Sequence, residues 1–203
     1  MTESGMLRGT FWRHLRLLGA LACAAGITSA LAQTVEVAGV KFEPTVQLDG
    51  ATLLLNGAGV RTRAIFKVYA AGLYVPQKST AAAALLAQKG PRRVTLTLLR
   101  DVSGETFAAA LQEGLKNNHT EAELAMIKAQ SDRLLATLAS LGEAKKGDAI
   151  FFEFVPETGT RIVVNGQPRG ESIAGEDFFT AVLRVWLGDK PADGDLKKGM
   201  LGG

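Results

Sequence analysis

Cysteine and histidine are almost missing from this 203-residue chain. The single cysteine, Cys23, lies in an N-terminal segment that we expect to be removed, so a disulfide, a thiol nucleophile and a thiolate metal site are excluded from the remainder. His119 is then the one histidine left. A multi-histidine metal site and a His-based catalytic relay are therefore excluded, no cofactor is expected, and we interpret His119 as a solvated loop residue.

Long apolar runs are missing as well. The apolar stretch at residues 17–27 is too short to cross a bilayer, which takes about 20 residues. Three arginines precede this stretch, and the small-residue sequence Ala30-Leu31-Ala32 follows it. Such an order is typical of a secretory signal peptide rather than a membrane anchor. We therefore predict a signal peptide over residues 1–32, cleavage after Ala32, no later membrane span, and a periplasmic or secreted bacterial protein.

Neither sign of charge dominates once this segment is removed. The whole chain has 23 basic and 20 acidic residues, and residues 33–203 keep 20 and 19, so the net charge falls from +3 to +1. No stripe of basic residues interleaved with aromatics remains, so we expect no nucleic-acid partner. Residues 33–203 are enough for one domain with its own core.

The apolar pattern of residues 33–203 predicts strands, then helices, then strands and a last helix. Val94, Leu96 and Leu98 alternate with polar residues, which indicates a strand with one buried face. Thr120 and Glu123 have the spacing of a capping box. Separate blocks of strands and helices are typical of an α+β domain with an antiparallel sheet. We expect strands at residues 35–37, 46–48, 52–55, 66–75, 92–99, 148–155 and 160–164, and helices at 81–88, 104–116, about 120–141 and 175–187.

One motif resembles a nucleotide-binding site and another a catalytic site, but each lacks residues that such a site needs. The sequence Asn56-Gly57-Ala58-Gly59 lacks the third glycine and the following helix of a dinucleotide site, so we interpret it as a hinge. Asp101, Ser103 and Glu105 include no base that could activate the serine. We interpret Arg100 and Asp101 as a local ion pair at a strand end.

Arg61 and Tyr69 are the strongest candidates for a ligand site. On one continuous strand they would lie about 26 Å apart, at roughly 3.3 Å per residue. If the chain reverses near Ile65, they face each other across an antiparallel pair with Cβ atoms about 5 Å apart. A guanidinium beside a phenol hydroxyl suits a carboxylate or an enolate-like oxygen. The alternative is a surface arginine paired with an acidic residue and a half-buried strand tyrosine.

Four motifs, in this order, resemble the chalcone isomerase family, and most closely its bacterial exported members. The resemblance covers essentially the whole chain after the signal peptide. It implies an open-faced β-sandwich, in which helices cover one face of a large antiparallel sheet and a ligand cleft lies between sheet and helices. The motifs are Asn-Gly-Ala-Gly-Val-Arg (56–61), Lys-Val-Tyr-Ala-Ala-Gly-Leu-Tyr-Val (67–75), Leu-Arg-Asp-Val-Ser-Gly (99–104) and Phe-Phe-Thr-Ala-Val-Leu-Arg-Val-Trp-Leu-Gly-Asp-Lys-Pro (178–191).

The resemblance also implies roles for single residues. In this family the arginine that matches Arg61 lines the cleft, and in plant chalcone isomerases it holds the substrate during cyclisation. The isomerase's strand threonine falls on Tyr69, its helix tyrosine near Leu124 and a last-helix threonine near Val185. These differences remove polar groups that flavonoid chemistry uses. In the fatty-acid-binding branch, an arginine and a tyrosine that match Arg61 and Tyr69 hold the ligand carboxylate in an otherwise apolar cleft.

Three classes of function follow. The first, which we favour, is non-catalytic binding of a small amphipathic, fatty-acid-like carboxylate by Arg61 and Tyr69. The second is an isomerase or intramolecular lyase of chalcone isomerase type, with Arg61 as its catalytic residue. The third is a ligand-free partner or structural protein whose cleft is filled by its own side chains.

Overall fold

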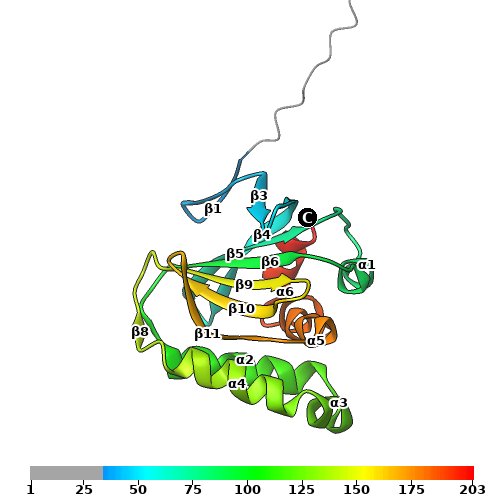
Figure 1. Cartoon of the computed structure of the whole chain (residues 1–203). Helices are drawn as coiled ribbons and strands as arrows, with labels where there is room; N and C mark the ends of the chain where they lie inside the picture. The colour runs from blue at the N-terminus through cyan, green and yellow to red at the C-terminus, as the bar shows by residue number, and fades with distance from the viewer. Residues whose placement is uncertain (1–33) are drawn as a thin grey trace, which may run out of the picture. The chain divides into compact units, whose positions relative to one another are not determined.

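A seven-stranded antiparallel sheet forms the centre of the domain (Figure 1). The computed structural model describes residues 34–203, so the expected signal peptide lies outside the described residues. The strands lie in the spatial order β11 (Gln167–Ile173), β10 (Gly159–Val164), β9 (Ala149–Val155), β6 (Arg92–Leu98), β5 (Phe66–Val75), β4 (Ala51–Arg63) and β3 (Thr45–Leu48). Two short antiparallel pairs join β1 (Val35–Val37) to β2 (Val40–Phe42) and β7 (Val102–Ser103) to β8 (Glu143–Ala144).

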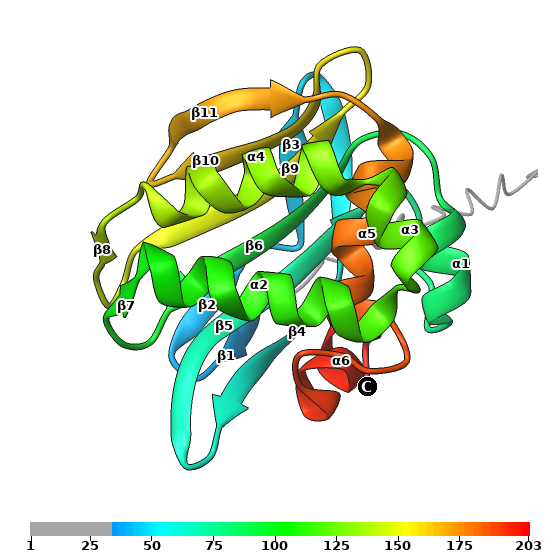
Figure 2. The same cartoon turned by 90° about the horizontal axis from the view of Figure 1, so that it is seen from below.

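Two of the longer helices cover one face of this sheet. Figure 2 shows α2 (Gly104–Asn118) and α4 (Lys128–Ala139) side by side across it. The predicted α+β open-faced β-sandwich is therefore confirmed. None of the helices in residues 34–203 is both long and apolar enough to cross a bilayer. The other helices are α1 (Ala82–Ala87), α3 (Glu121–Met126), α5 (Glu176–Leu187) and α6 (Gly194–Met200).

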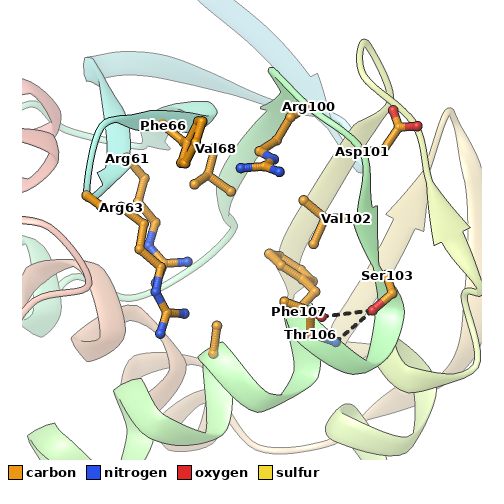
Figure 3. Close-up of a pocket in the computed structure, with 12 residues that line it drawn as sticks. Arg61, Arg63, Phe66, Val68, Arg100, Asp101, Val102, Ser103, Thr106 and Phe107 are labelled. Carbon is orange, nitrogen blue, oxygen red and sulfur yellow. Dashed lines mark hydrogen bonds between the residues drawn. The ribbon is translucent and has the colours of Figure 1, made fainter.

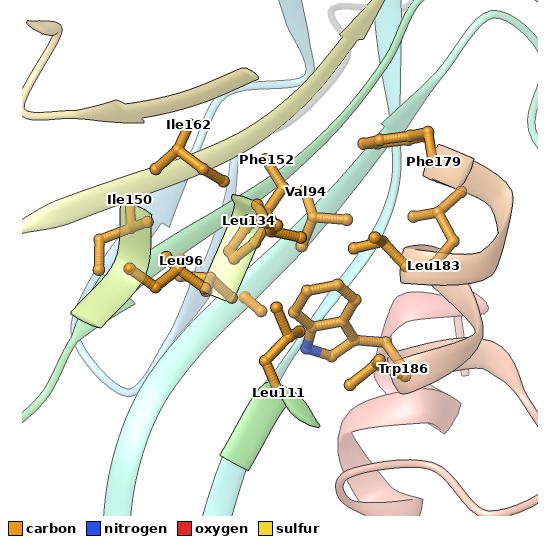
Figure 4. Close-up of a cluster of buried hydrophobic side chains, with 14 of the residues drawn as sticks. Val94, Leu96, Leu111, Leu134, Ile150, Phe152, Ile162, Phe179, Leu183 and Trp186 are labelled. Carbon is orange, nitrogen blue, oxygen red and sulfur yellow. The ribbon is translucent and has the colours of Figure 1, made fainter. Parts of the chain in front are cut away.

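The main hydrophobic core lies between the sheet and the helices (Figure 4). The predicted alternation along β6 is confirmed, because Val94, Leu96 and Leu98 are at most 1% exposed while the residues between them are half-buried. Helix α2 buries Leu111 and helix α5 buries Trp186 against them. Full burial of one such apolar side chain contributes about 1.5–3 kcal/mol to stability.

Strand β4 is longer than the sequence predicts, and the prediction of a hinge at residues 56–59 is wrong. These residues continue the strand. The glycines serve the packing of α6 instead: a Cβ at Gly57 would lie 2.2 Å from the Gly199 carbonyl oxygen, and one at Gly59 would lie 3.1 Å from the Leu196 Cα. Because an added Cβ would meet backbone atoms, the strand needs glycine where the helix crosses it.

The predicted helix over residues 120–141 is two helices. The capping box at its start is confirmed, since Thr120 Oγ1 accepts a hydrogen bond from the Glu123 N–H at 3.2 Å and the Glu123 carboxylate accepts one from the Thr120 N–H at 2.7 Å. Ile127, with φ −102° and ψ 8°, then separates α3 from α4. The apolar stripe continues through this break, which is why the sequence pattern does not reveal it.

Candidate ligand-binding site

The β4–β5 hairpin brings the two candidate residues together. The chain reverses at Ala64 and Ile65, and Arg61 lies directly opposite Tyr69 in the antiparallel register. The expected reversal near Ile65 is therefore confirmed. Ala64 enables the turn by adopting a left-handed conformation with φ 54°, which alanine rarely does. No glycine, proline, asparagine or aspartate marks this turn in the sequence.

Next to this hairpin lies a cavity of about 420 Å³ between the sheet and the start of α2 (Figure 3). This volume lies within the range of about 300–1,000 Å³ that small-molecule sites occupy. One part of the lining is apolar and another is strongly basic, so the cavity suits a ligand with an apolar body and an anionic group. The apolar lining consists of Ala64, Phe66, Val68, Val102, Phe107 and Ala110, the basic lining of Arg61, Arg63 and Arg100, and the remaining polar lining of Asp101, Ser103 and Thr106.

Arg61 has no partner for its charge among residues 34–203. Its guanidinium forms no ion pair there, and its Nε is buried without a hydrogen-bond acceptor. The guanidinium carbon lies 5.7 Å from the centre of the Tyr69 ring. Arg63 and Arg100, which line the same cavity, also form no ion pair within the described part of the chain. A buried donor without an acceptor is costly, so an anion bound here would relieve that cost.

Tyr69 lies behind the cavity wall rather than in its lining. The side chain is 2% exposed, and its hydroxyl accepts a hydrogen bond of 3.0 Å from the Trp186 Nε1–H. Burial raises the pKa of the Tyr69 hydroxyl, and the positive charge of Arg61 opposes that rise. The phenol is therefore protonated at neutral pH and can still donate its own proton. A contact between Tyr69 and a ligand stays a prediction.

Aromatic side chains close the space behind the cavity. The rings of Tyr69 and Phe107 meet edge to face with centres 6.5 Å apart. The centres of the Phe107 and Phe152 rings lie 6.0 Å apart. Phe152 in turn contacts Trp186 at 5.4 Å. The cavity is consequently a cleft at one side of the core, not a tunnel through it.

The expected ion pair between Arg100 and Asp101 does not form. Asp101 instead accepts hydrogen bonds from the Lys146 backbone N–H at 2.8 Å and from Lys145 Nζ at 3.2 Å, and these bonds lower the pKa of its carboxyl group. Arg100 lies over the ring of Phe66, 4.9 Å from its centre. The guanidinium is thus free of acidic partners in residues 34–203, although it stands next to an aspartate in sequence.

Three other residues named by the sequence analysis do not line this cavity. The interpretation of His119 as a solvated residue is wrong, because its side chain is half-buried. Its Nδ1 lies 2.9 Å from the Leu115 carbonyl oxygen, and burial lowers the pKa of the imidazole. Leu124 lies in a separate groove between α2, α3 and α4. Val185 packs against Gly114 of α2. The described residues hold no group of three or more side chains suited to a metal ion.

Sequence reasoning missed most of the cavity. Ser103, considered for catalysis, caps α2 by accepting a hydrogen bond from the Thr106 N–H at 3.1 Å. Arg63 could have been found, because it lies two positions after Arg61 on a strand and so shares its face in a regular ladder. No comparable signal points to Arg100, which joins the site through the pairing of β5 with β6.

Comparisons with known proteins identify the fold. The family described as chalcone isomerase-like matches residues 34–202. A crystal structure of a fatty-acid binding protein from Arabidopsis thaliana is similar, with a TM-score of 0.65 and 14% sequence identity over 83% of this chain and 96% of that chain. At this identity the similarity concerns the fold alone. No curated protein sequence matches the chain.

Proposed function

The chain belongs to the chalcone isomerase-like family, and we propose that it binds a small amphipathic, fatty-acid-like carboxylate without chemical turnover. One observation carries this proposal: the Arg61 guanidinium, without a partner among residues 34–203, lines a cavity whose other wall is apolar. The similarity in fold to a fatty-acid binding protein supports the same conclusion.

In this proposal the ligand carboxylate lies between Arg61, Arg63 and Arg100. A hydrogen bond to a charged group contributes about 1.5–3 kcal/mol, and a guanidinium can form two such bonds with one carboxylate. Each buried methylene of the tail adds about 0.8 kcal/mol. The tail therefore supplies most of the affinity, and the arginines select for the negative charge.

The tail would lie along Phe66, Val68 and Phe107. Because the aromatic side chains from Phe107 to Trp186 are packed behind the cavity, we propose that chains of medium length bind better than long ones. A series of saturated fatty acids of increasing length tests this point. Affinity should rise with each methylene and then level off when the cavity is full.

The two alternative functions have less support. An isomerase of chalcone isomerase type would need polar groups at Leu124 and Val185, and neither position lines the cavity. A ligand-free partner protein would fill its cleft with its own side chains, whereas this cleft keeps about 420 Å³.

The test uses the purified protein and isothermal titration calorimetry with saturated fatty acids. Arg61→Gln should weaken binding by about 10- to 100-fold, which corresponds to one charged hydrogen bond. The control is Arg133→Gln, on α4 at the surface, which should bind as the unaltered protein does. A fatty alcohol of equal length should not distinguish Arg61→Gln from the unaltered protein. Equal fatty-acid affinity in both proteins would disprove the proposal, and so would turnover of a chalcone.

The proposed place of action is the bacterial periplasm, after cleavage of the signal peptide. Cell fractionation followed by intact-mass measurement tests both parts. The exported protein should begin at Gln33. Native mass spectrometry of the same preparation reports whether a fatty acid has co-purified. Protein that keeps its first 32 residues and stays in the cytoplasm would overturn this part of the proposal.

A further inference from the structure

The turn between β4 and β5 exposes two neighbouring apolar side chains. Ile65 is 85% exposed and Phe66 is 55% exposed. In residues 34–203 only two other large apolar side chains are exposed, Val35 and Met126, and they are far apart in sequence. Figure 2 shows the β4–β5 turn extending beyond the rest of the sheet and the helices. The turn is thus an apolar tip on a projecting hairpin.

Positive charges surround this tip. Arg63 precedes it, Lys67 follows it, and Arg100 lies over the Phe66 ring at 4.9 Å. None of the three cations forms an ion pair within residues 34–203. An exposed apolar tip surrounded by unpaired cations is complementary to a surface that is negatively charged outside and apolar just beneath, which describes an anionic lipid bilayer.

Two nearby carboxylates form no ion pair with Arg63, Lys67 or Arg100. Asp101 is held by Lys145 and by the Lys146 backbone N–H. Asp193 accepts hydrogen bonds from the Thr62 N–H at 2.8 Å and from two N–H groups at the start of α6. Because neither carboxylate pairs with the three cations in the described part of the chain, these cations stay available to an anionic surface.

We propose that the β4–β5 tip docks the protein on the surface of an anionic lipid bilayer. Ile65 and Phe66 enter the headgroup region, and Arg63 and Lys67 contact lipid phosphates. The inference rests on the proposed function and deepens it, because Arg63 and Phe66 also line the ligand cavity. The cavity then opens at the bilayer surface, where a fatty-acid-like ligand can enter from the lipid or return to it.

The docking is weak and reversible. Each cation near an anionic bilayer strengthens binding about fivefold, and two apolar side chains are far fewer than a permanent anchor needs. Binding should therefore depend on anionic lipid and fall as salt is added. A carrier needs such reversibility, because it must leave the bilayer with its ligand.

The experiment measures co-sedimentation of the purified protein with vesicles of phosphatidylcholine, with and without phosphatidylglycerol. We expect binding only to the vesicles with phosphatidylglycerol. Ile65→Asp should reduce it at least about tenfold, because the aspartate adds a charge where the tip enters the headgroups. Lys67→Glu should reduce it by a similar factor. The matched controls are Met126→Asp, another exposed apolar residue, and Lys78→Glu, a lysine beyond the opposite end of β5, and both should bind as the unaltered protein does.

Docking and ligand binding are measured separately. Ile65 does not line the cavity, so Ile65→Asp should keep its fatty-acid affinity in solution while it loses vesicle binding. Arg61→Gln should bind vesicles as the unaltered protein does but lose fatty-acid affinity. Equal binding to both kinds of vesicle, or full vesicle binding by Ile65→Asp, overturns the docking proposal whatever the calorimetry reports. Circular dichroism spectra identical to that of the unaltered protein exclude misfolding as the cause of any loss.

Discussion

The Trp186 indole donates its Nε1–H to the Tyr69 hydroxyl over 3.0 Å, and each side chain is 2% exposed. This bond fixes the phenol between the core and Arg61, whose guanidinium lies 5.7 Å from the Tyr69 ring centre. The tyrosine therefore has a structural role whether or not it touches a ligand.

Tyr69→Phe should lower the free energy of unfolding by about 1–3 kcal/mol, because it leaves the Trp186 N–H buried without an acceptor. Urea denaturation measures this change. Tyr74→Phe is the matched control: the Tyr74 hydroxyl donates to the carbonyl oxygen of Glu43 at 3.0 Å, and because Glu43 is exposed, water can take the place of that donor. An equal loss in both variants would contradict a special role for the Tyr69–Trp186 bond.

Gly57→Ala should destabilise the protein by about 1–3 kcal/mol, because the added Cβ would overlap the backbone of α6 and force the helix away from β4. Thermal unfolding measures the effect. Gly194→Ala serves as the control, since nothing lies within 4 Å of its added Cβ and alanine suits a helix better than glycine. That variant should be neutral or slightly stabilised. If Gly57→Ala were as stable, the close approach of α6 would not need glycine.

Glu153 is a buried carboxylate held by two arginines, Arg93 and Arg161, at 2.6 Å each. Glu153→Gln should cost about 3–5 kcal/mol, because it leaves two guanidinium groups without their common partner. Glu171→Gln, which removes a surface pair with Arg133 at 3.0 Å, should cost less than about 1 kcal/mol. Chemical denaturation of the two variants compares them directly. Similar losses would show that burial does not decide the strength of these pairs.

Acid should weaken the start of α3. Hydrogen bonds from the Thr120 backbone N–H and from Arg184 lower the pKa of Glu123 to about 2, against 4.5 in an unfolded chain. Because the folded protein holds the deprotonated form more strongly, this stabilisation is present above pH 4.5 and is lost as the pH falls towards 2. Glu123→Gln should lose this part of the pH dependence in urea titrations between those values, whereas Glu121→Gln should keep it. Identical pH profiles for all three proteins would contradict the assignment.

Local sequence patterns were sufficient for most of the fold. The alternation in β6 and the Thr120–Glu123 capping box are formed by residues close together in sequence, so their spacing predicts them. The family resemblance added the arrangement of sheet and helices. The sequence does not predict helix α6, strand β11 or the short strands β2, β7 and β8. Helix α6 is short and contains glycine, most of β11 is exposed and polar without alternation, and the other three strands have only two or three residues each.

The site was predicted only in part. The pairing of Arg61 with Tyr69 follows from the position of the turn, although Ala64 gives no turn signal of the usual kind. The contribution of Arg100 and Phe107 depends on how β6 and α2 pack, which no local pattern encodes. The glycines at 57 and 59 were misread as a hinge because their partner helix lies about 140 residues further along the chain.

Contacts between β4 and α6 also bear on the order of folding. The Asn56 side chain donates a hydrogen bond to the Met200 carbonyl oxygen at 2.7 Å, across 144 positions of sequence. The chain between Asn56 and Met200 must close into a loop before α6 can cover the strand that carries Arg61. Contacts between residues far apart in sequence slow folding. A chain cut after α5 would present an uncovered glycine-rich strand, so the strand that carries Arg61 should be among the last parts of the sheet to become rigid.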